Sequence, residues 1–286
     1  MIPYGKQNIN QDDIEAVLKV LESDYITQGP IVPAFEKKIS NYCKSKYAVA
    51  VNSATSALHI ACKALDLKSG DIAWTSPNTF VASSNCVLYC DAKIDFVDID
   101  PLTGNISIEK LEEKLIKAKK ENKLPKVVIP VHMTGEPCDM QSIDRLRKEY
   151  NFKVIEDASH AIGAKHKGSH IGDCKYSDIV VFSFHPVKII TTAEGGMACT
   201  NSEKLYNKMN LLRSHGITRD PNMMNQKPHG SWYYQQIEIG FNYRMTEIQA
   251  ALGYSQMDRI DSFIKKRHEI ASIYDSKLAN LPLKLP

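Results

Sequence analysis

The sequence predicts an α/β fold in which helices cover both faces of a mainly parallel β-sheet. Short apolar runs alternate with helical repeats through roughly the first 200 residues, and this alternation is typical of α/β folds. Two of the runs, at 127–131 and 179–182, are apolar at almost every position, as strands buried on both faces are. A chain of 286 residues is long enough to bury the large core that such a fold requires.

The first predicted elements are helical. Asp12 and Asp13 are suited to cap a first helix. The apolar positions of this helix are Ile14, Val17, Leu18 and Leu21. The segment 25–30 is predicted to be a loop, and Pro33 suits the first turn of a second helix.

Strands and helices then alternate along the chain. The predicted strands are 47–51, 71–75, 93–97, 126–131, 153–156, 179–184 and 196–200. The predicted helices are 55–66, 79–89, 107–120, 139–149 and 202–213. A polar loop is predicted at 222–232, and a helical repeat of apolar residues begins near Met245.

The composition excludes several classes of function. The net charge is +3 and lysines are interspersed with acidic residues, so we expect neither a nucleic-acid groove nor a membrane-binding patch. No apolar segment resembles a signal peptide or a membrane span, which predicts a cytoplasmic protein. The seven cysteines are scattered without CxxC spacing, so we expect buried, reduced thiols and no metal site.

Two residues that follow buried strands carry the chemical argument. Lys188 comes just after the apolar run 179–184, and Asp157 ends the run before it. A lysine amine can form a Schiff base with an aldehyde, and a carboxylate can keep a ring nitrogen protonated. Together they suggest pyridoxal phosphate (PLP). Taken singly, Lys188 could be an ordinary solvated lysine and Asp157 a surface turn residue.

Other candidate contacts follow the ends of the same strands. The small residues of 52–59 could place helix N–H groups against a phosphate, although they also suit an ordinary capped helix. Phe80 could stack on a cofactor ring or belong to the core. His160 could reach the phenolic oxygen of the cofactor or be a hydrogen-bonded core histidine, and Ser183 could hold the phosphate. Carboxyl ends of parallel strands share one sheet edge, so we expect these side chains to meet there.

Several motifs extend this hypothesis to the whole chain. They are Ile26-Thr-Gln-Gly29, Asn52-Ser-Ala-Thr-Ser-Ala57, Ser159-His-Ala-Ile-Gly163, Phe182-Ser-Phe-His185, Ile190-Thr-Thr-Ala-Glu-Gly-Gly196, Arg213-Ser-His-Gly216 and Asn242-Tyr-Arg-Met-Thr-Glu247. With them the chain resembles the sugar aminotransferases of the DegT/DnrJ/EryC1/StrS family. The resemblance implies the aspartate aminotransferase (type I) fold, with a large PLP-binding domain at 1–243. Residues 244–286 would be a connecting helix and the start of a small C-terminal domain that is mostly absent.

The resemblance also implies a role for each candidate residue. Lys188 binds the cofactor as a Schiff base and moves the proton, and Asp157 pairs with the ring nitrogen. The implied cofactor-binding residues are Ala54, Thr55, Phe80, Asp157, His160, Ser183, Lys188 and, from the second subunit of a homodimer, Asn242. The implied substrate-binding residues are Tyr4, Tyr25, Ile26, Thr27, Gln28, Ser53, Ser183 and Asn242.

The implied reaction transfers an amino group from L-glutamate to C4 of a UDP-linked 4-keto-6-deoxy-N-acetylhexosamine, in pseudaminic acid-type sugar biosynthesis. Two alternatives stay open. One is a non-catalytic sensor, regulator or pseudoenzyme with the PLP-binding fold. The other is a sugar dehydratase of the same fold, but those relatives have a histidine at the position of Lys188.

Overall fold

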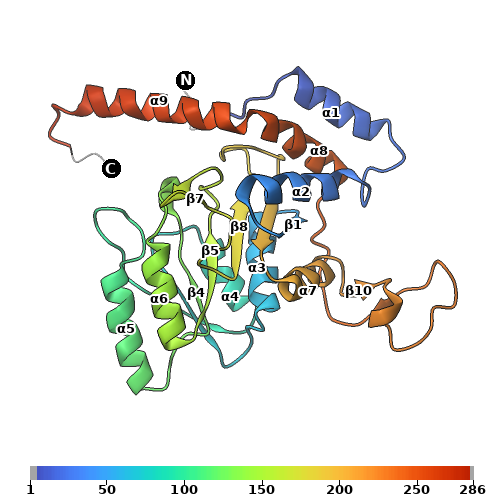
Figure 1. Ribbon diagram of the computed structural model, residues 1–286, viewed down its shortest axis with the longest axis horizontal. Helices are drawn as coiled ribbons and strands as arrows, with labels where there is room; N and C mark the ends of the chain where they lie inside the picture. Colours follow the sequence, from blue (N-terminus) through green and yellow to red (C-terminus); the bar gives the residue numbers. More distant parts are fainter. Residues whose placement is uncertain (1–4, 284–286) are drawn as a thin grey trace.

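Seven strands form one sheet at the centre of the molecule (Figure 1), in the order β1-β9-β8-β5-β4-β2-β3. The structure is a computed structural model and describes residues 5–283. The strands are β1 (Tyr47–Val51), β2 (Ile72–Thr75), β3 (Lys93–Phe96), β4 (Val127–Ile129), β5 (Lys153–Asp157), β8 (Ile179–Ser183) and β9 (Gly196–Thr200). In this sheet β9 runs antiparallel to both of its neighbours, and the other pairs are parallel. The mainly parallel seven-stranded sheet is therefore confirmed.

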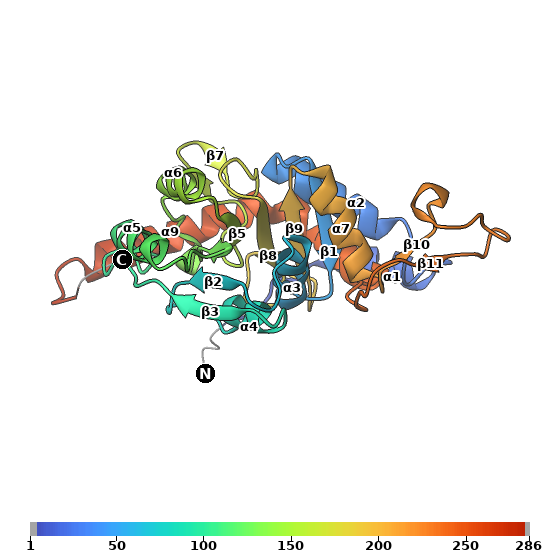
Figure 2. The ribbon, with the colours of Figure 1, turned by 90° about the horizontal axis from the view of Figure 1, so that it is seen from below.

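Helices cover both faces of the sheet, as predicted (Figure 2). On one face lie α3 (Ala54–Ala64), α4 (Ala82–Leu88) and α7 (Glu203–Arg213). On the other lie α2 (Ile31–Cys43), α5 (Ile108–Lys120), α6 (Met140–Tyr150) and α8 (Glu247–Gln256). The remaining helices, α1 (Gln11–Leu21) and α9 (Ile260–Leu278), extend along one side of the molecule in Figure 1.

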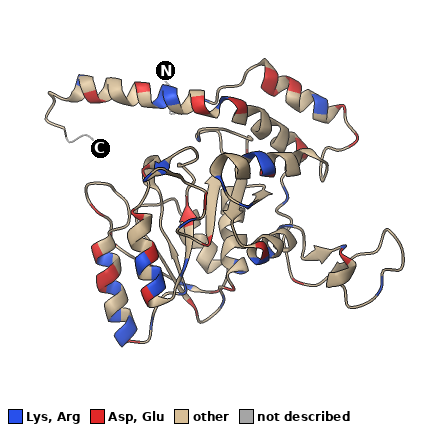
Figure 3. Ribbon diagram, viewed as in Figure 1, with Lys and Arg blue, Asp and Glu red and all other residues tan. Residues whose placement is uncertain are grey.

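Side chains alternate along each strand, so each face of the sheet has its own hydrophobic core. In β8, Ile179 and Val181 join the core under α3, while Val180 and Phe182 join the core under α2. All of β8 is therefore buried, which explains its uninterrupted apolar sequence. Charged residues gather on outer helices such as α5 and α6, and the strands carry few of them (Figure 3). Within the described residues, no helix is both long and apolar enough to cross a membrane.

Several short elements were not predicted from the sequence. They are β6 (Lys165–His166), β7 (Ser169–His170), β10 (Ile217–Thr218), β11 (Gln235–Gln236), and the 3₁₀ turns η1 (Met133–Gly135), η2 (Pro221–Met223) and η3 (Met257–Arg259). Elements of two or three residues are too short for a hydrophobic period to show. The pair β10–β11 supports an arm that projects from the body of the molecule in Figure 1.

The predicted start of the first helix is wrong. The N-cap of α1 is Asn10, whose side chain accepts a hydrogen bond of 3.1 Å from the Asp13 backbone N–H. Asp13 in turn accepts one of 3.1 Å from the Asn10 N–H, which completes a capping box. The expected apolar positions Ile14 and Leu18 are 46% and 47% exposed. The helix is instead turned so that the buried Asp13 faces α8.

Asp13 joins α1 to α8 and η3, and this interaction can be tested. The carboxylate is fully buried, accepts hydrogen bonds of 2.7 Å from Ser255 Oγ and Gln256 Nε2, and forms an ion pair with Arg259. We expect Asp13→Ala to lower the free energy of unfolding by about 3 kcal/mol, because it leaves buried donors and a cation without their partner. Denaturant titration measures the loss. The exposed neighbour provides the control, and Asp12→Ala should change stability by less than about 0.5 kcal/mol; similar losses in both variants would contradict the role of Asp13.

Candidate active site

Three chain segments meet at the carboxyl edge of the sheet. Asp157 ends β5, Lys188 lies in the loop between β8 and β9, and α3 begins directly after β1. The strand order places β8 beside both β5 and β9, and β9 beside β1. The topology therefore brings the predicted acid, amine and helix start to one edge, where open α/β sheets bind ligands.

Asp157 is a buried carboxylate that accepts three hydrogen bonds. It is 4% exposed, so the alternative that it is a surface turn residue is wrong. Ser83 Oγ donates to Oδ2 at 2.6 Å, while the hydroxyl and the N–H of Ser159 donate to Oδ1 at 2.6 and 3.1 Å. Ser83 Oγ also lies 2.7 Å from Thr79 Oγ1. These donors stabilise a negative charge at a position from which water is largely excluded.

Lys188 presents an amine that is free to react. The residue is half-buried, and among residues 5–283 its Nζ has no hydrogen-bond or ion-pair partner. Burial lowers the pKa of Lys188, and the nearby Asp157 opposes this shift. A lowered pKa increases the fraction of neutral amine, which is the form that attacks an aldehyde. Lys188 is therefore less solvated than an ordinary surface lysine.

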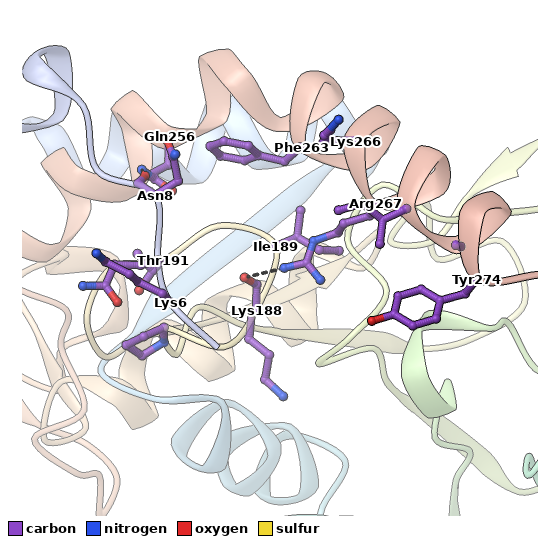
Figure 4. A pocket seen from close by; sticks show the side chains of 14 residues that line it. Lys6, Asn8, Lys188, Ile189, Thr191, Gln256, Phe263, Lys266, Arg267 and Tyr274 are labelled. Carbon is purple, nitrogen blue, oxygen red and sulfur yellow. Dashed lines mark hydrogen bonds between the residues drawn. The ribbon is translucent and has the colours of Figure 1, made fainter. Parts of the chain in front are cut away.

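The backbone of Lys188 is held on the side that faces α9. Its carbonyl oxygen accepts a hydrogen bond of 3.4 Å from Arg267, and its side chain points away from Arg267 (Figure 4). A cavity of about 600 Å³ lies between the Lys188 loop and α9. Its lining combines the basic residues Lys6, Lys266 and Arg267 with apolar ones such as Phe263.

His160 is the third titratable group at this edge. Burial lowers the pKa of His160, the nearby Lys188 lowers it further, and Asp157 has the opposite effect. The half-buried imidazole is therefore mainly neutral near pH 7 and lies close to both groups. A neutral imidazole can both donate and accept a hydrogen bond.

The start of α3 is a capped helix whose first N–H groups are available to an anion. The Ser53 side chain is the N-cap and accepts a hydrogen bond of 3.1 Å from the Ser56 N–H. Ala54 and Thr55 form the first turn, whose N–H groups have no partner within a helix. A Cβ atom on Gly196 would lie 2.5 Å from the Ser53 carbonyl oxygen, so only glycine lets β9 pass this close. Both interpretations of 52–59 are therefore compatible with the structure.

The other candidate cofactor contacts differ in their burial. Ser183 is 7% exposed and pairs with Gly196 in the sheet, beside the start of α3. Phe80 is 74% exposed, so its assignment to the core is wrong. The predicted helix 79–89 begins only at Ala82, which leaves Phe80 in the loop after β2.

The remaining substrate candidates lie in two other segments. Residues 25–28 form an exposed loop, and Tyr4 lies outside the described residues. Asn242 is exposed, and its backbone carbonyl is 3.5 Å from the side-chain amide of Asn52. Asn242 does not cap the following helix, because Thr246 is the N-cap of α8.

Sequence analysis missed Ser83, which holds the carboxylate of Asp157. The two residues are 74 positions apart, and nothing in the local sequence of α4 distinguishes Ser83 from its neighbour Ser84. No local signal in the sequence indicates this contact, because it depends on how α4 packs against the end of β5.

Comparison with known proteins identifies the family of the chain. The profile of the DegT/DnrJ/EryC1/StrS aminotransferase family matches residues 7–286. A UDP-4-amino-4,6-dideoxy-N-acetyl-beta-L-altrosamine transaminase of Campylobacter jejuni is 42% identical over 277 residues, which cover 97% of this chain and 69% of that protein.

Solved structures of aminotransferases have the same fold. Helicobacter pylori PseC, an aminotransferase of pseudoaminic acid biosynthesis, superposes with a TM-score of 0.89 at 33% identity, covering 98% of this chain and 71% of that one. A protein of Streptococcus pneumoniae assigned as a sugar aminotransferase has a TM-score of 0.85 in its PLP form, at 30% identity, with coverages of 98% and 72%. A form of that protein with pyridoxamine phosphate is also similar. The expected fold and cofactor are thereby confirmed, and the chain belongs to the DegT/DnrJ/EryC1/StrS aminotransferase family.

Proposed function

We propose that this PLP-dependent aminotransferase moves an amino group from L-glutamate to C4 of a UDP-linked 4-keto-6-deoxy-N-acetylhexosamine, in the cytoplasm. A reaction of this kind supplies 4-amino sugars of the pseudaminic acid type. The observation that carries the proposal is the half-buried amine of Lys188, which has no hydrogen-bond or ion-pair partner among residues 5–283 and lies near the buried carboxylate of Asp157. The choice of a UDP-linked sugar is supported by the name of the Campylobacter relative.

The residues at the sheet edge fit the cofactor. When bound, PLP supplies an electron sink for the carbon that gains or loses the amino group. Asp157 would pair with the protonated ring nitrogen, because its carboxylate is oriented by hydrogen bonds from Ser83 and Ser159 and shielded from water. Lys188 would bind the cofactor covalently and later carry the proton to and from the reacting carbon. His160 would hydrogen-bond the phenolic oxygen.

The other residues of the proposed site would bind the phosphate, the cofactor ring and the sugar nucleotide. Ala54, Thr55 and Ser183 would hold the phosphate at the start of α3, where the helix dipole favours an anion. Phe80, exposed in the loop after β2, would cover one face of the ring. The residues proposed to contact the sugar nucleotide are Tyr4, Tyr25, Ile26, Thr27, Gln28, Ser53, Ser183 and Asn242.

The two alternative functions, a sensor or pseudoenzyme and a sugar dehydratase, require different residues at the site. A sensor or pseudoenzyme has no need for an amine with a lowered pKa, and a dehydratase of this fold has histidine in place of Lys188. The retained lysine therefore favours the aminotransferase. A visible absorption scan of the purified protein before and after addition of glutamate would distinguish these cases, because only an active aminotransferase converts the bound cofactor.

The substrate assignment has a direct test. Purified protein with PLP and L-glutamate should convert the UDP-linked 4-keto sugar to a 4-amino sugar, identified by mass spectrometry and located at C4 by NMR. We expect the UDP-linked sugar to be converted faster than a GDP-linked 4-keto sugar. Preference for the GDP-linked sugar, or amination at another carbon, would overturn the proposed substrate while leaving the aminotransferase assignment intact.

Lys188 should be the residue that binds PLP covalently. Borohydride reduction followed by peptide mass analysis should find the cofactor on Lys188, because this amine is half-buried and has no partner within the part of the chain that the structure describes. Lys188→Ala should lower turnover by at least about 10²–10⁴-fold, the usual contribution of a positioned proton-transfer group. Lys266→Arg, at the cavity beside the same loop, is the control and should keep the adduct. An adduct on a different lysine contradicts the assignment.

We further propose a homodimer in which Asn242 completes the site of the partner subunit. The exposed side chain of Asn242 could serve either subunit, because its backbone also lies beside Asn52 of its own chain. Mixing Lys188→Ala chains with Asn242→Ala chains tests which subunit's site Asn242 serves. If Asn242 acts across the interface, each mixed dimer regains one intact site and part of its activity returns. Mixed dimers that form but stay inactive would show that Asn242 serves its own chain.

A further inference from the structure

The hydroxyl groups of Thr79 and Ser83 form a chain that ends on the carboxylate of Asp157. Thr79 Oγ1 lies 2.7 Å from Ser83 Oγ, and Ser83 Oγ donates to Asp157 Oδ2 at 2.6 Å. Ser83 is 0% exposed and Asp157 is 4% exposed, whereas Thr79 is half-buried. The chain of hydroxyls therefore runs from the loop after β2, through the first turn of α4, to the end of β5.

The direction of this chain follows from the protons that its members carry. A serine hydroxyl has one proton to donate. Ser83 donates that proton to Asp157, so its oxygen accepts the proton of the Thr79 hydroxyl. A hydroxyl that accepts a hydrogen bond is polarised and becomes a stronger donor, particularly where water is excluded. The Thr79 hydroxyl therefore strengthens the bond between Ser83 and the carboxylate.

The Thr79 hydroxyl has no other structural task in the part of the chain that the structure describes. The N-cap of α4 is Val81, and no side chain caps this helix. The backbone of the loop is held by other groups, because Asn78 Nδ2 donates to the Gly104 carbonyl at 3.2 Å and the Thr79 N–H donates to the Pro77 carbonyl at 3.1 Å. The loop should therefore keep its conformation when the hydroxyl alone is removed.

The two oxygens of the Asp157 carboxylate are fixed by different segments. Ser159, in the turn after β5, donates to Oδ1 through its hydroxyl and its N–H, and Ser83 donates to Oδ2. Removal of either donor would free the carboxylate to rotate about its Cβ–Cγ bond. Each carboxylate oxygen has two lone pairs, so Oδ2 can accept a second donor while Ser83 holds it.

We propose that Thr79 is a positioning residue of the aminotransferase reaction, which acts through Ser83 on Asp157. This inference rests on the proposed pairing of Asp157 with the ring nitrogen of PLP. The hydroxyl chain holds Oδ2 in the orientation in which its free lone pair accepts the N–H of the ring. Phe80 directly follows Thr79, so the loop proposed to cover the ring is also attached to the carboxylate proposed to bind it.

A double-mutant cycle on the protein with PLP bound tests whether Thr79 acts through Ser83. The rate measured is that of cofactor conversion by saturating L-glutamate, followed by absorbance. Thr79→Val should slow it about 2- to 10-fold, and Ser83→Ala roughly 10- to 100-fold, because a hydrogen bond to a carboxylate is worth more than one between hydroxyls. The double variant should be no slower than Ser83→Ala, because Thr79 then has no hydroxyl to act on. Losses that multiply in the double variant, or a wild-type rate in Thr79→Val, would overturn the proposal.

The protonation of the ring nitrogen gives a readout that does not depend on turnover. Nitrogen NMR of bound PLP, labelled with ¹⁵N in the ring, reports the pH at which this nitrogen loses its proton. We expect that pH to be lower in Thr79→Val and to return to the wild-type value in Thr79→Ser, which keeps the hydroxyl. Ser84→Ala is the matched control and should resemble the wild type, because the Ser84 hydroxyl donates to the Val81 carbonyl at 2.9 Å instead. No recovery in Thr79→Ser, or an equal loss in Ser84→Ala, contradicts the role of Thr79.

The Asp157→Asn variant separates this inference from the proposed function. If Asp157→Asn converts the cofactor as fast as the wild type, Asp157 does not pair with the ring nitrogen and both proposals are wrong. If Asp157→Asn loses conversion while Thr79→Val behaves like the wild type, only the role of Thr79 is wrong. Thermal unfolding checks that each variant is folded, and Thr79→Ala replaces Thr79→Val in the cycle if the valine variant does not fold.

Discussion

Burial of the Asp157 carboxylate is the constraint on which the geometry of the candidate active site depends. A charge that is 4% exposed is costly unless donors surround it. Two of those donors come from Ser159 in the turn after β5, and the third comes from Ser83 on α4. The first turns of α4 must therefore lie against the end of β5. The same arrangement leaves Phe80, just before α4, in a loop at the carboxyl edge of the sheet.

Other buried carboxylates hold the frame around this edge. Glu247, which is fully buried, accepts hydrogen bonds of 2.6 and 3.1 Å from the N–H groups of Ile31 and Val32, so α8 caps α2. Glu36 accepts a bond of 2.8 Å from the Ala50 N–H and pairs with Arg213, which joins α2, β1 and α7. Each acid links segments that are distant in the sequence. At both positions the buried charge is compensated by backbone or guanidinium donors.

Much of the fold could be predicted from the sequence because the sheet is buried on both faces. Strands β1 and β9 coincide with the predicted ranges 47–51 and 196–200, and the other five strands differ from theirs by at most two residues at either end. The errors have local causes. Asn10, rather than Asp12 or Asp13, is the N-cap of α1, because its side chain and that of Asp13 form the capping box. The apolar stripe of α1 indicated a buried face, but the hydrogen bonds of Asp13 decide how the helix is turned.

The sequence by itself determined the helices and central strands, the positions of Asp157 and Lys188 at strand ends, and the family motifs around them. These features depend on near neighbours along the chain, so periodicity and local composition reveal them. Only the tertiary structure decided that Ser83 donates to Asp157, that Gln256 donates to Asp13, and that Phe80 is exposed. Such contacts depend on the order of the strands and on the packing of helices across them. These contacts are therefore set by packing across the whole core, and no single segment of the sequence reveals them.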